Sequence, residues 1–182
     1  MDKNKLRQQI YKCLNNISIN QKKEWSNNIF QQIINDSIIS NSQVIGIYYS
    51  INDEVDTKLL IEYLLKNNKK VCLPRVNDEV INFYQITSYD FAYEKYWKIK
   101  QPLINSVFCQ METIDVLIMP GLAFDSFNYR LGRGKGHYDK FLTNFKKPTI
   151  MLAFNCQKIK KIPHQIWDIP VKFVYTEVKK YE

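Results

Sequence analysis

Closely spaced glycines in a short basic stretch are the residues whose spacing points most directly to chemistry. They lie in RLGRGKGHYDKFL, and they are Gly132, Gly134 and Gly136, three of the five glycines in the chain. Glycine has no Cβ atom and permits positive φ angles, so successive N–H groups can point into one concavity that accepts an anion. Arg133 and Lys135 stand between the glycines and supply full positive charges. Residues 130–136, the glycine loop, are therefore predicted to bind phosphate.

The residues that flank the glycines add further means of holding a nucleotide. Arg130 opens the loop, and an arginine can bind phosphate through two parallel hydrogen bonds. A helix is predicted to start at Tyr138, and the N-terminal end of a helix favours negative charge. Asp139 follows at once, and a carboxylate beside phosphates suits Mg²⁺. The spacing matches neither the Walker loop nor the dinucleotide fingerprint, so a flexible basic turn remains the alternative.

Hydrophobic patterning predicts the elements that must position this loop. Apolar runs rich in β-branched and aromatic residues predict buried strands at residues 44–49, 115–120, 149–154 and 171–176. Amphipathic spacing predicts helices over residues 3–16, after a cap at Asn20, after a cap at Asp56, and over residues 138–144. This alternation favours an α/β fold, a largely parallel central sheet flanked by helices on both faces. Ligands bind such sheets in a cleft at the carboxyl ends of the strands, where we expect residues 50–56 to meet the glycine loop.

The stretch between residues 70 and 110 is less regular. Residues 70–74 predict another buried strand, which Pro74 is expected to stop. Residues 79–86 fit an exposed strand, and no regular structure is predicted for residues 87–110.

Length and composition narrow the class of protein. The 182 residues predict one domain, because no repeat, low-complexity segment or linker divides them. The net charge of +8 comes almost wholly from lysine, and no RNA-binding motif accompanies it, so we expect no nucleic-acid partner. No apolar stretch is long enough to cross a membrane, and the polar start does not fit a signal peptide. We therefore expect a monomeric cytoplasmic protein without a membrane partner.

The four cysteines are widely scattered and form no Cys-x-x-Cys pair; they are Cys13, Cys72, Cys109 and Cys156. This spacing indicates neither a zinc site nor a disulfide framework. We expect four reduced, mostly buried thiols.

The longest motif resembles a known family. Residues 119–142, MPGLAFDSFNYRLGRGKGHYDKFL, resemble the signature of 5-formyltetrahydrofolate cyclo-ligases, also called 5,10-methenyltetrahydrofolate synthetases. Three shorter patterns of that family occur in the right order: a Lys-x-x-Leu-Arg pattern at residues 3–7, a Ser-x-x-x-Glu-x-x-Thr pattern at residues 50–57, and Leu-Pro-Arg at residues 73–75. The resemblance implies an enzyme that uses ATP and Mg²⁺ to convert 5-formyltetrahydrofolate into 5,10-methenyltetrahydrofolate, ADP and phosphate. It also implies an iminium phosphate intermediate that N10 of the same folate attacks.

Residue roles follow from position in the family's motifs. The resemblance implies that ATP is held by Lys3, Arg7, Arg130, Leu131, Gly132, Arg133, Gly134, Lys135, Gly136, His137 and Tyr138. It implies that the folate, with or without a polyglutamate chain, is held by Tyr49, Glu54, Trp97, Arg133, Lys135, Gly136 and His137. Arg133 and Lys135 are the expected catalytic residues, and Asp139 is the expected Mg²⁺ ligand.

Structural alternatives stand beside several of these roles. Lys3 and Arg7 lie four residues apart, so both face one side of a helix, which could also be an ordinary solvated face. Glu54 could be a solvated loop acid, and the ring of Trp97 could fill the core instead of stacking on the folate. Asp139 could be an early-turn helix charge.

The chain departs from the family pattern in four places. Asn128 and Tyr129 precede Arg130 where the family often has glycine, but asparagine tolerates the left-handed conformation. His137 replaces an aromatic residue, and Gln101 stands where the family usually has glutamate. Lys172 stands where some members have a second metal-binding aspartate, a role that Asp168 or water could take.

Two other classes of function stay open at this level. A sugar-phosphate or coenzyme A enzyme could use a similar scaffold, although no distinctive nucleophile motif for one appears. A non-catalytic RNA-binding module could exploit the positive charge, in which case binding would depend strongly on salt and not on ATP.

Overall fold

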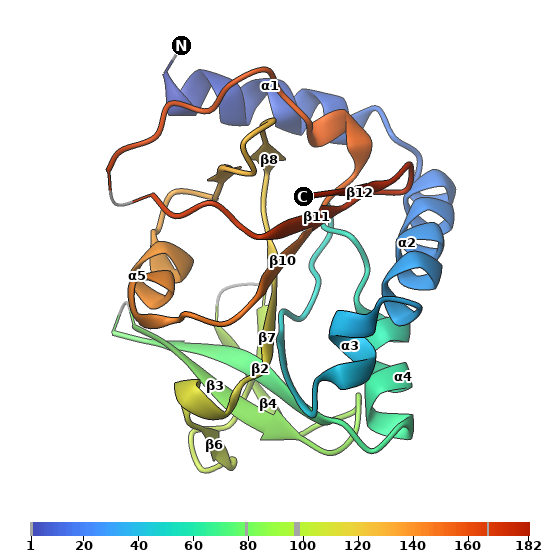
Figure 1. The fold of residues 1–182 in the computed structure, drawn as a ribbon, viewed down its shortest axis with the longest axis vertical. Coiled ribbons are helices and arrows are strands. Elements are labelled where there is room, and N and C mark those ends of the chain that lie inside the picture. Colours follow the sequence, from blue (N-terminus) through green and yellow to red (C-terminus); the bar gives the residue numbers. More distant parts are fainter. Residues whose placement is uncertain (1, 79, 97–98, 167) are drawn as a thin grey trace.

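A twisted sheet of eight strands runs through the centre of the molecule (Figure 1). The computed structural model describes residues 2–78, 80–96, 99–166 and 168–182. The strand order is β12 (Lys180–Tyr181), β11 (Phe173–Tyr175), β10 (Thr149–Leu152), β7 (Val116–Pro120), β1 (Val44–Ile47), β2 (Lys70–Asn77), β3 (Val80–Ile86) and β6 (Phe108–Cys109). The five strands from β11 to β2 are parallel, whereas β12, β3 and β6 pair antiparallel to their neighbours. The predicted, largely parallel sheet is confirmed.

Helices cover both faces of this sheet (Figure 1). Alternate residues of β7 belong to two apolar clusters, because successive side chains of a strand point to opposite faces. Val116 and Ile118 join the cluster packed by α1 (Lys3–Asn15), α2 (Ile19–Ile34), α3 (Ser37–Asn41) and α4 (Lys58–Lys66). Leu117 and Met119 join the cluster that includes α5 (His137–Asn144). The shorter 3₁₀ turns are η1 (Met111–Thr113) and η2 (Asn155–Gln157).

The helices begin close to where the sequence predicts, but their caps differ. Ser18, not Asn20, caps α2: its hydroxyl accepts a hydrogen bond from the backbone N–H of Gln21 at 3.1 Å. Asn20 lies inside the first turn, where its side chain cannot serve the N-terminal N–H groups. The cap residue of α4 is Thr57, and the carboxylate of Asp56 accepts from the first helical N–H at 2.9 Å.

The strands predicted at residues 70–74 and 79–86 are present, but the stop at Pro74 and the exposure of the second strand are wrong. β2 continues through Pro74 to Asn77, because its parallel pairing with β1 ends at Cys72 and no donor is needed on that side beyond it. β3 is an interior strand between β2 and β6, and Ile81, Phe83 and Ile86 are buried. Within residues 87–110, the structure adds β6 and a hairpin of β4 (Tyr93–Tyr96) and β5 (Ile99–Pro102).

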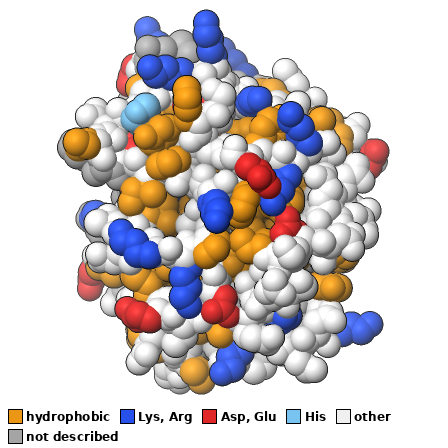
Figure 2. Space-filling model, in the orientation of Figure 1, with side chains coloured by type: hydrophobic (Ala, Val, Ile, Leu, Met, Phe, Trp, Pro, Cys, Tyr) orange, Lys and Arg blue, Asp and Glu red, His pale blue; other side chains and the backbone are white. Residues whose placement is uncertain are grey.

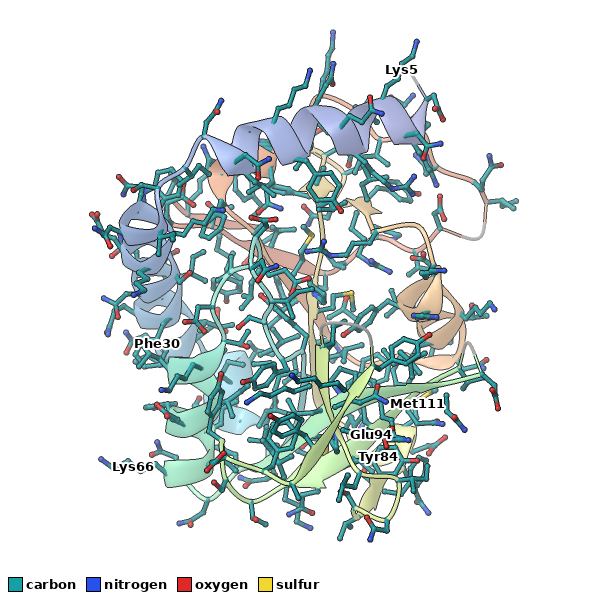
Figure 3. The ribbon with its side chains drawn as sticks, turned by 180° about the vertical axis from the view of Figure 1, so that it is seen from behind. Lys5, Phe30, Lys66, Tyr84, Glu94 and Met111 are labelled. Carbon is teal, nitrogen blue, oxygen red and sulfur yellow. A yellow bond between two sulfur atoms is a disulfide. The ribbon has the colours of Figure 1, made fainter. Side chains whose placement is uncertain are left out.

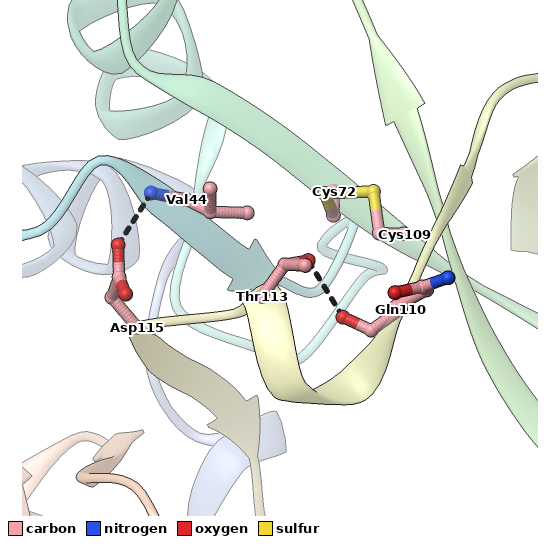
Figure 4. Close-up of a disulfide and its surroundings, with 6 residues drawn as sticks. All are labelled: Val44, Cys72, Cys109, Gln110, Thr113 and Asp115. Carbon is pink, nitrogen blue, oxygen red and sulfur yellow. Dashed lines mark hydrogen bonds between the residues drawn. A yellow bond between two sulfur atoms is a disulfide. The ribbon is translucent and has the colours of Figure 1, made fainter.

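A disulfide corrects the prediction of four reduced thiols. Cys72 on β2 is bonded to Cys109 on β6, so the bridge spans the strand that lies between them (Figure 4). The two cysteines lie 37 residues apart, and only the folding of the sheet edge brings them together. Cys13 and Cys156 are free and half-buried.

The helices in the described ranges are too short or too polar to cross a lipid bilayer.

Candidate active site

The glycine loop begins with β9 (Arg130–Leu131), which pairs with β8 (Ala123–Phe124), and it leads directly into α5. Gly134 has φ +107° and Gly136, the N-cap of α5, has φ +71°. Both values lie where an L-side chain is strained, so these two positions require glycine. Asn128, before the loop, also adopts a positive φ of 59°, as its tolerance of that conformation predicts. The sequence therefore builds a turn whose N–H groups precede a helix N-terminus.

Helix α1 reaches the glycine loop through its first two turns. The Nε atom of Arg7 donates to the carbonyl oxygen of Gly132 at 3.0 Å. A Cβ atom at Gly134 would lie 3.5 Å from the guanidinium carbon of Arg7, an ordinary van der Waals distance, so the loop and this cation lie in close proximity. Lys3, one turn earlier, forms a 2.8 Å ion pair with Asp168. The predicted common face of Lys3 and Arg7 is confirmed, and it places Arg7 against the loop.

Arg133 joins the glycine loop to the loop that follows β1. Its Nε and Nη2 atoms donate to one carboxylate oxygen of Glu54 at 3.3 Å and 3.2 Å. Its Nη1 atom donates to the hydroxyl of Tyr11 on α1 at 3.2 Å. The predicted meeting of residues 50–56 with the glycine loop is confirmed. Tyr11 was not among the predicted site residues, although it continues the four-residue spacing of Lys3 and Arg7.

Glu54 is a buried carboxylate and not a solvated loop acid. Its side chain is only 10% exposed, and its second oxygen accepts from the N–H of Ile51 at 3.1 Å. Burial raises the pKa of Glu54 above its ordinary value, although Arg133 and the Ile51 N–H oppose that shift. Burial and the charge of Glu54 likewise raise the pKa of the Tyr138 phenol, which stays neutral at physiological pH. A buried carboxylate of this kind favours a ligand that offers paired N–H donors.

Arg130 and Asp139 form an ion pair behind the glycine loop. An Nη2 atom of Arg130 donates to Asp139 Oδ1 at 2.7 Å, and the guanidinium lies 5.5 Å from the ring centre of Tyr138. The side chain of Arg130 is only 5% exposed, and its buried Nε atom has no hydrogen-bond partner among the described residues. An unsatisfied buried donor costs stability, so an acceptor that reached this atom would be favoured.

Asp139 fits a magnesium ion that a nucleotide brings, but not a metal held by protein ligands alone. Among the described residues, no three His, Cys, Asp or Glu side chains gather closely enough to hold a metal ion. Mg²⁺ is commonly held by one or two carboxylates, with phosphates and waters completing its shell. The carboxylate of Asp139 is one-third exposed and retains oxygen lone pairs beyond the Arg130 contact.

Asp168, the residue that could replace a second metal-binding aspartate, is engaged by other groups. Asp168 accepts from Lys3 Nζ and from the N–H of Gln165. Burial alone would raise the pKa of Asp168, but these two contacts hold it below its ordinary value. The ammonium of Lys172 lies 5.4 Å from the ring centre of Phe173.

Aromatic side chains surround Tyr49, which follows β1 at the carboxyl edge of the sheet. Its ring stacks on Tyr89 at 5.4 Å between centres and meets Phe91 edge-on at 5.8 Å. The ammonium of Lys100, on β5, lies 5.9 Å from the Tyr49 ring centre. Tyr89 and Phe91 belong to the segment for which the sequence predicts no structure. Trp97, the other aromatic expected here, lies outside the described residues.

The remaining predicted residues of the glycine loop differ in access. Leu131 is 1% exposed and its carbonyl accepts from the N–H of Leu122, so only its backbone could serve a ligand. Lys135 is exposed between its two glycines, and His137 is half-buried at the first position of α5. His164, the other histidine of the chain, is not a predicted site residue; its ring stacks on that of Tyr129 at 3.8 Å between ring centres.

A cavity of about 430 Å³ lies elsewhere, beside β3 and β6. Phe83, Phe108, Met111, Glu112 and Phe141 are among its lining residues, and the lining that the structure describes includes no lysine or arginine. Figure 3 places Met111 at the end of the molecule opposite α1. This cavity has no charge that suits a phosphate. On the face in Figure 2, Lys and Arg side chains are scattered among Asp and Glu and do not form one patch.

The fold and the site together define an α/β protein with a glycine-rich loop, surrounded by arginine and lysine side chains, at the carboxyl edge of its sheet. Comparison with known proteins is consistent with that class and narrows it. The model of the 5-formyltetrahydrofolate cyclo-ligase family matches residues 1–177. The chain therefore belongs to this family, and the resemblance seen in its motifs is confirmed.

Relatives and solved structures of the family match along most of the chain. The chain is 32% identical over 148 residues to the 5-formyltetrahydrofolate cyclo-ligase of Escherichia coli K12, covering 78% of this chain and 81% of the relative. It is 30% identical over 186 residues to that of Mus musculus, covering 94% and 92%. The solution structure of Aquifex aeolicus 5,10-methenyltetrahydrofolate synthetase superposes with a TM-score of 0.90 at 29% identity, covering all of this chain and 93% of that one. The Mycoplasma pneumoniae synthetase gives a TM-score of 0.80 at 25% identity, covering 97% and 99%.

Proposed function

We propose that the protein uses ATP and Mg²⁺ to convert 5-formyltetrahydrofolate into 5,10-methenyltetrahydrofolate. The observation that carries this proposal is the contact between Arg133 and Glu54. It places a cation suited to a phosphate directly against a buried carboxylate suited to a pterin ring. The family's relatives named above are cyclo-ligases and synthetases of this reaction.

The reaction needs an activated formyl oxygen and a nucleophile within the same molecule. The formyl oxygen attacks the γ-phosphorus of ATP, and the bond to ADP breaks. The resulting iminium phosphate carries an electrophilic carbon, which the N10 atom attacks. The C–O bond then breaks, phosphate leaves with its electron pair, and N10 loses its proton. Positioning and charge neutralisation are what the protein must supply to such a transfer.

The cations around the glycine loop would serve the phosphates. Arg133 and Lys135 would contact the transferred phosphoryl group, and their positive charge would stabilise its transition state. The N–H groups of residues 132–136 would bind phosphate oxygens at the N-terminus of α5. Arg7, already bound to the loop carbonyl of Gly132, would add charge from α1. The orphaned Nε of Arg130 would gain a partner in the same ligand. Lys3 and the half-buried His137 and Tyr138 would border the nucleotide.

Asp139 would hold Mg²⁺ when a nucleotide is bound, and the ion would neutralise charge on the phosphates. The ion pair with Arg130 keeps this carboxylate oriented.

The folate would lie between Glu54 and the aromatic group around Tyr49. The pterin's amino and ring N–H groups are paired donors, which a carboxylate can accept together. Stacking on Tyr49 and on Trp97 would hold the flat rings. His137 and Gly136 would border the folate from the glycine loop.

We propose further that the protein acts as a cytoplasmic monomer. The glycine loop, residues 50–56 and α1 come from one chain, so the site needs no partner copy. Size-exclusion chromatography should give one species near 21.7 kDa, and a dimer would contradict this part of the proposal.

One assay tests the proposed reaction. Purified protein is mixed with 5-formyltetrahydrofolate, ATP and Mg²⁺, and the absorbance of the methenyl product is followed together with ADP release. Product should form with one ADP per turnover, and omission of ATP or of the metal should abolish it. Failure to form methenyl product with every component present would refute the proposal.

A further inference from the structure

Arg133 contacts two residues, and we expect substrate binding to break only one of these two contacts. The glycines on both sides of Arg133 leave its backbone little constrained, and its side chain is 37% exposed. Its orientation therefore depends on its side-chain contacts. Those contacts are the carboxylate of Glu54 and the hydroxyl of Tyr11.

The two contacts occupy different edges of the guanidinium. Glu54 takes the edge formed by Nε and Nη2, whereas Tyr11 takes Nη1 alone. The Nε–Nη2 edge is one of those through which arginine binds a phosphate with two parallel bonds. Arg133 must therefore leave Glu54 before it can offer that edge to a nucleotide. It does not have to leave Tyr11.

Tyr11 is anchored independently of either substrate. It lies on α1, whose Leu6, Ile10 and Leu14 are buried in the core, and its own ring packs partly against that core. The Arg133 guanidinium also lies 6.0 Å from the centre of this ring. A neutral hydroxyl leaves the full positive charge of Arg133 for an anion, whereas a carboxylate competes with one.

We propose that Tyr11 is a positioning residue for the reaction, which holds Arg133 toward the nucleotide after the pterin has taken Glu54. This inference rests on the proposed function, because it needs a folate at Glu54 and a phosphate at Arg133. Tyr11 touches neither substrate and acts through Arg133 alone. The Tyr11 hydroxyl keeps its hydrogen bond with Nη1 while the Nε–Nη2 edge of Arg133 exchanges the Glu54 carboxylate for a phosphate.

The test is the Tyr11→Phe variant, which keeps the ring and its packing but removes the hydroxyl. Calorimetry measures the affinity of β,γ-imido-ATP with Mg²⁺ for protein saturated with 5-formyltetrahydrofolate. Loss of one hydrogen bond to a charged group should weaken this affinity by about tenfold or more. Folate affinity in the absence of nucleotide should not change, and in turnover kcat should fall while the KM for folate stays constant.

A double-mutant cycle separates positioning from a general structural effect. Tyr11→Phe should cause no further loss in an Arg133→Ala background, because the residue through which it acts is gone. Tyr63→Phe is the matched control: that ring packs against Phe30 on α2, which Figure 3 places away from the N-terminal end of α1. It should bind both ligands as the wild type does.

The outcomes distinguish this inference from the proposed function. If the wild type binds both ligands and Tyr11→Phe binds nucleotide equally well, the positioning role is refuted and the proposed function stands. An equal loss in the wild-type and Arg133→Ala backgrounds also refutes it. If the wild type binds no folate or no nucleotide, the proposed function and the positioning role of Tyr11 are both refuted.

Discussion

Glu54→Gln should change the affinities for the two substrates in opposite directions. The substitution keeps the size of the side chain and one carbonyl oxygen, but it removes the charge. In the substrate-free protein this carboxylate is 90% buried and bound to Arg133 at 3.2 Å. The variant therefore loses a charged acceptor for the pterin and at the same time releases an arginine for the phosphate.

The structure sets the size of both effects. Hydrogen bonds to charged groups are worth about 1.5–3 kcal/mol and neutral ones about 1 kcal/mol, so folate binding should lose about 0.5–2 kcal/mol, or about 2-fold to 30-fold. Arg133 is one-third exposed, and partly solvated ion pairs contribute at most about 1 kcal/mol. Release of Arg133 should therefore tighten binding of an ATP analogue to folate-free protein by up to about fivefold.

Calorimetry with each ligand alone measures both effects, and Asp53→Asn is the matched control. Asp53 is the neighbouring carboxylate, and it pairs with Lys22 at 2.9 Å instead of with Arg133. The control should leave both affinities unchanged. Equal tightening of nucleotide binding in Asp53→Asn would mean that loss of any nearby negative charge tightens binding, and that release of Arg133 is not the cause. Unchanged folate affinity in Glu54→Gln would refute the role given to Glu54.

The stability of Glu54→Gln distinguishes lost binding from lost folding. Because burial raises the pKa of Glu54, ionising it costs folding free energy as the pH rises from the ordinary pKa through the raised one. The glutamine variant should thus be at least as stable as the wild type at pH 8. Its advantage should shrink toward pH 4, where the wild-type group becomes protonated. Thermal unfolding at the two pH values checks this sign, and a lower midpoint at pH 8 would contradict it.

Three further predictions concern the loop, the C-terminal strands and the cysteines. Gly134→Ala should weaken binding of the ATP analogue more than Gly136→Ala, because the φ of +107° at Gly134 lies well outside the left-handed region that alanine can adopt, whereas the φ of +71° at Gly136 lies at its edge; equal losses would contradict this. Asp36→Asn should cost about 1–2 kcal/mol of unfolding free energy at pH 7, since Asp36 accepts from Lys180 and from a tyrosine hydroxyl. Burial alone would raise the pKa of Asp36, but these contacts lower it, so the loss should vanish as the pH falls through the lowered pKa; a pH-independent loss would contradict this. Thiol titration of the unfolded, unreduced chain should find two reactive thiols, and four would exclude the bridge between Cys72 and Cys109.

The parallel part of the fold was predictable because its strands carry a strong local signal. The buried strands β1, β7 and β10 are continuous apolar runs, which have few other stable arrangements. β4 carries no such signal: all four of its residues are exposed, and only its pairing with β5 makes it a strand. Pro74 shows the opposite case: proline breaks a strand where its missing N–H is needed for pairing, but beyond Cys72 β2 has no partner on the side of β1 and pairs only with β3.

The candidate site was predictable where a motif specified it and not where only the fold creates a contact. The positive φ angles at Gly134 and Gly136 follow from residue type, as does the charge around them. The burial of Glu54 does not, because it arises from packing of residues 50–56 against distant segments. A tyrosine on a helix is ordinarily assigned to the core, so the residue type of Tyr11 alone does not indicate a place in the site. Its four-residue spacing from Arg7 is the signal that could have revealed it.

A structure of the protein with β,γ-imido-ATP, Mg²⁺ and 5-formyltetrahydrofolate bound would show where both substrates lie. We expect the terminal phosphate within hydrogen-bond distance of Arg133 and Lys135, with the Arg133–Glu54 contact broken and the pterin on Glu54. A triphosphate bound away from residues 130–136, with Arg133 still on Glu54, would contradict this expectation.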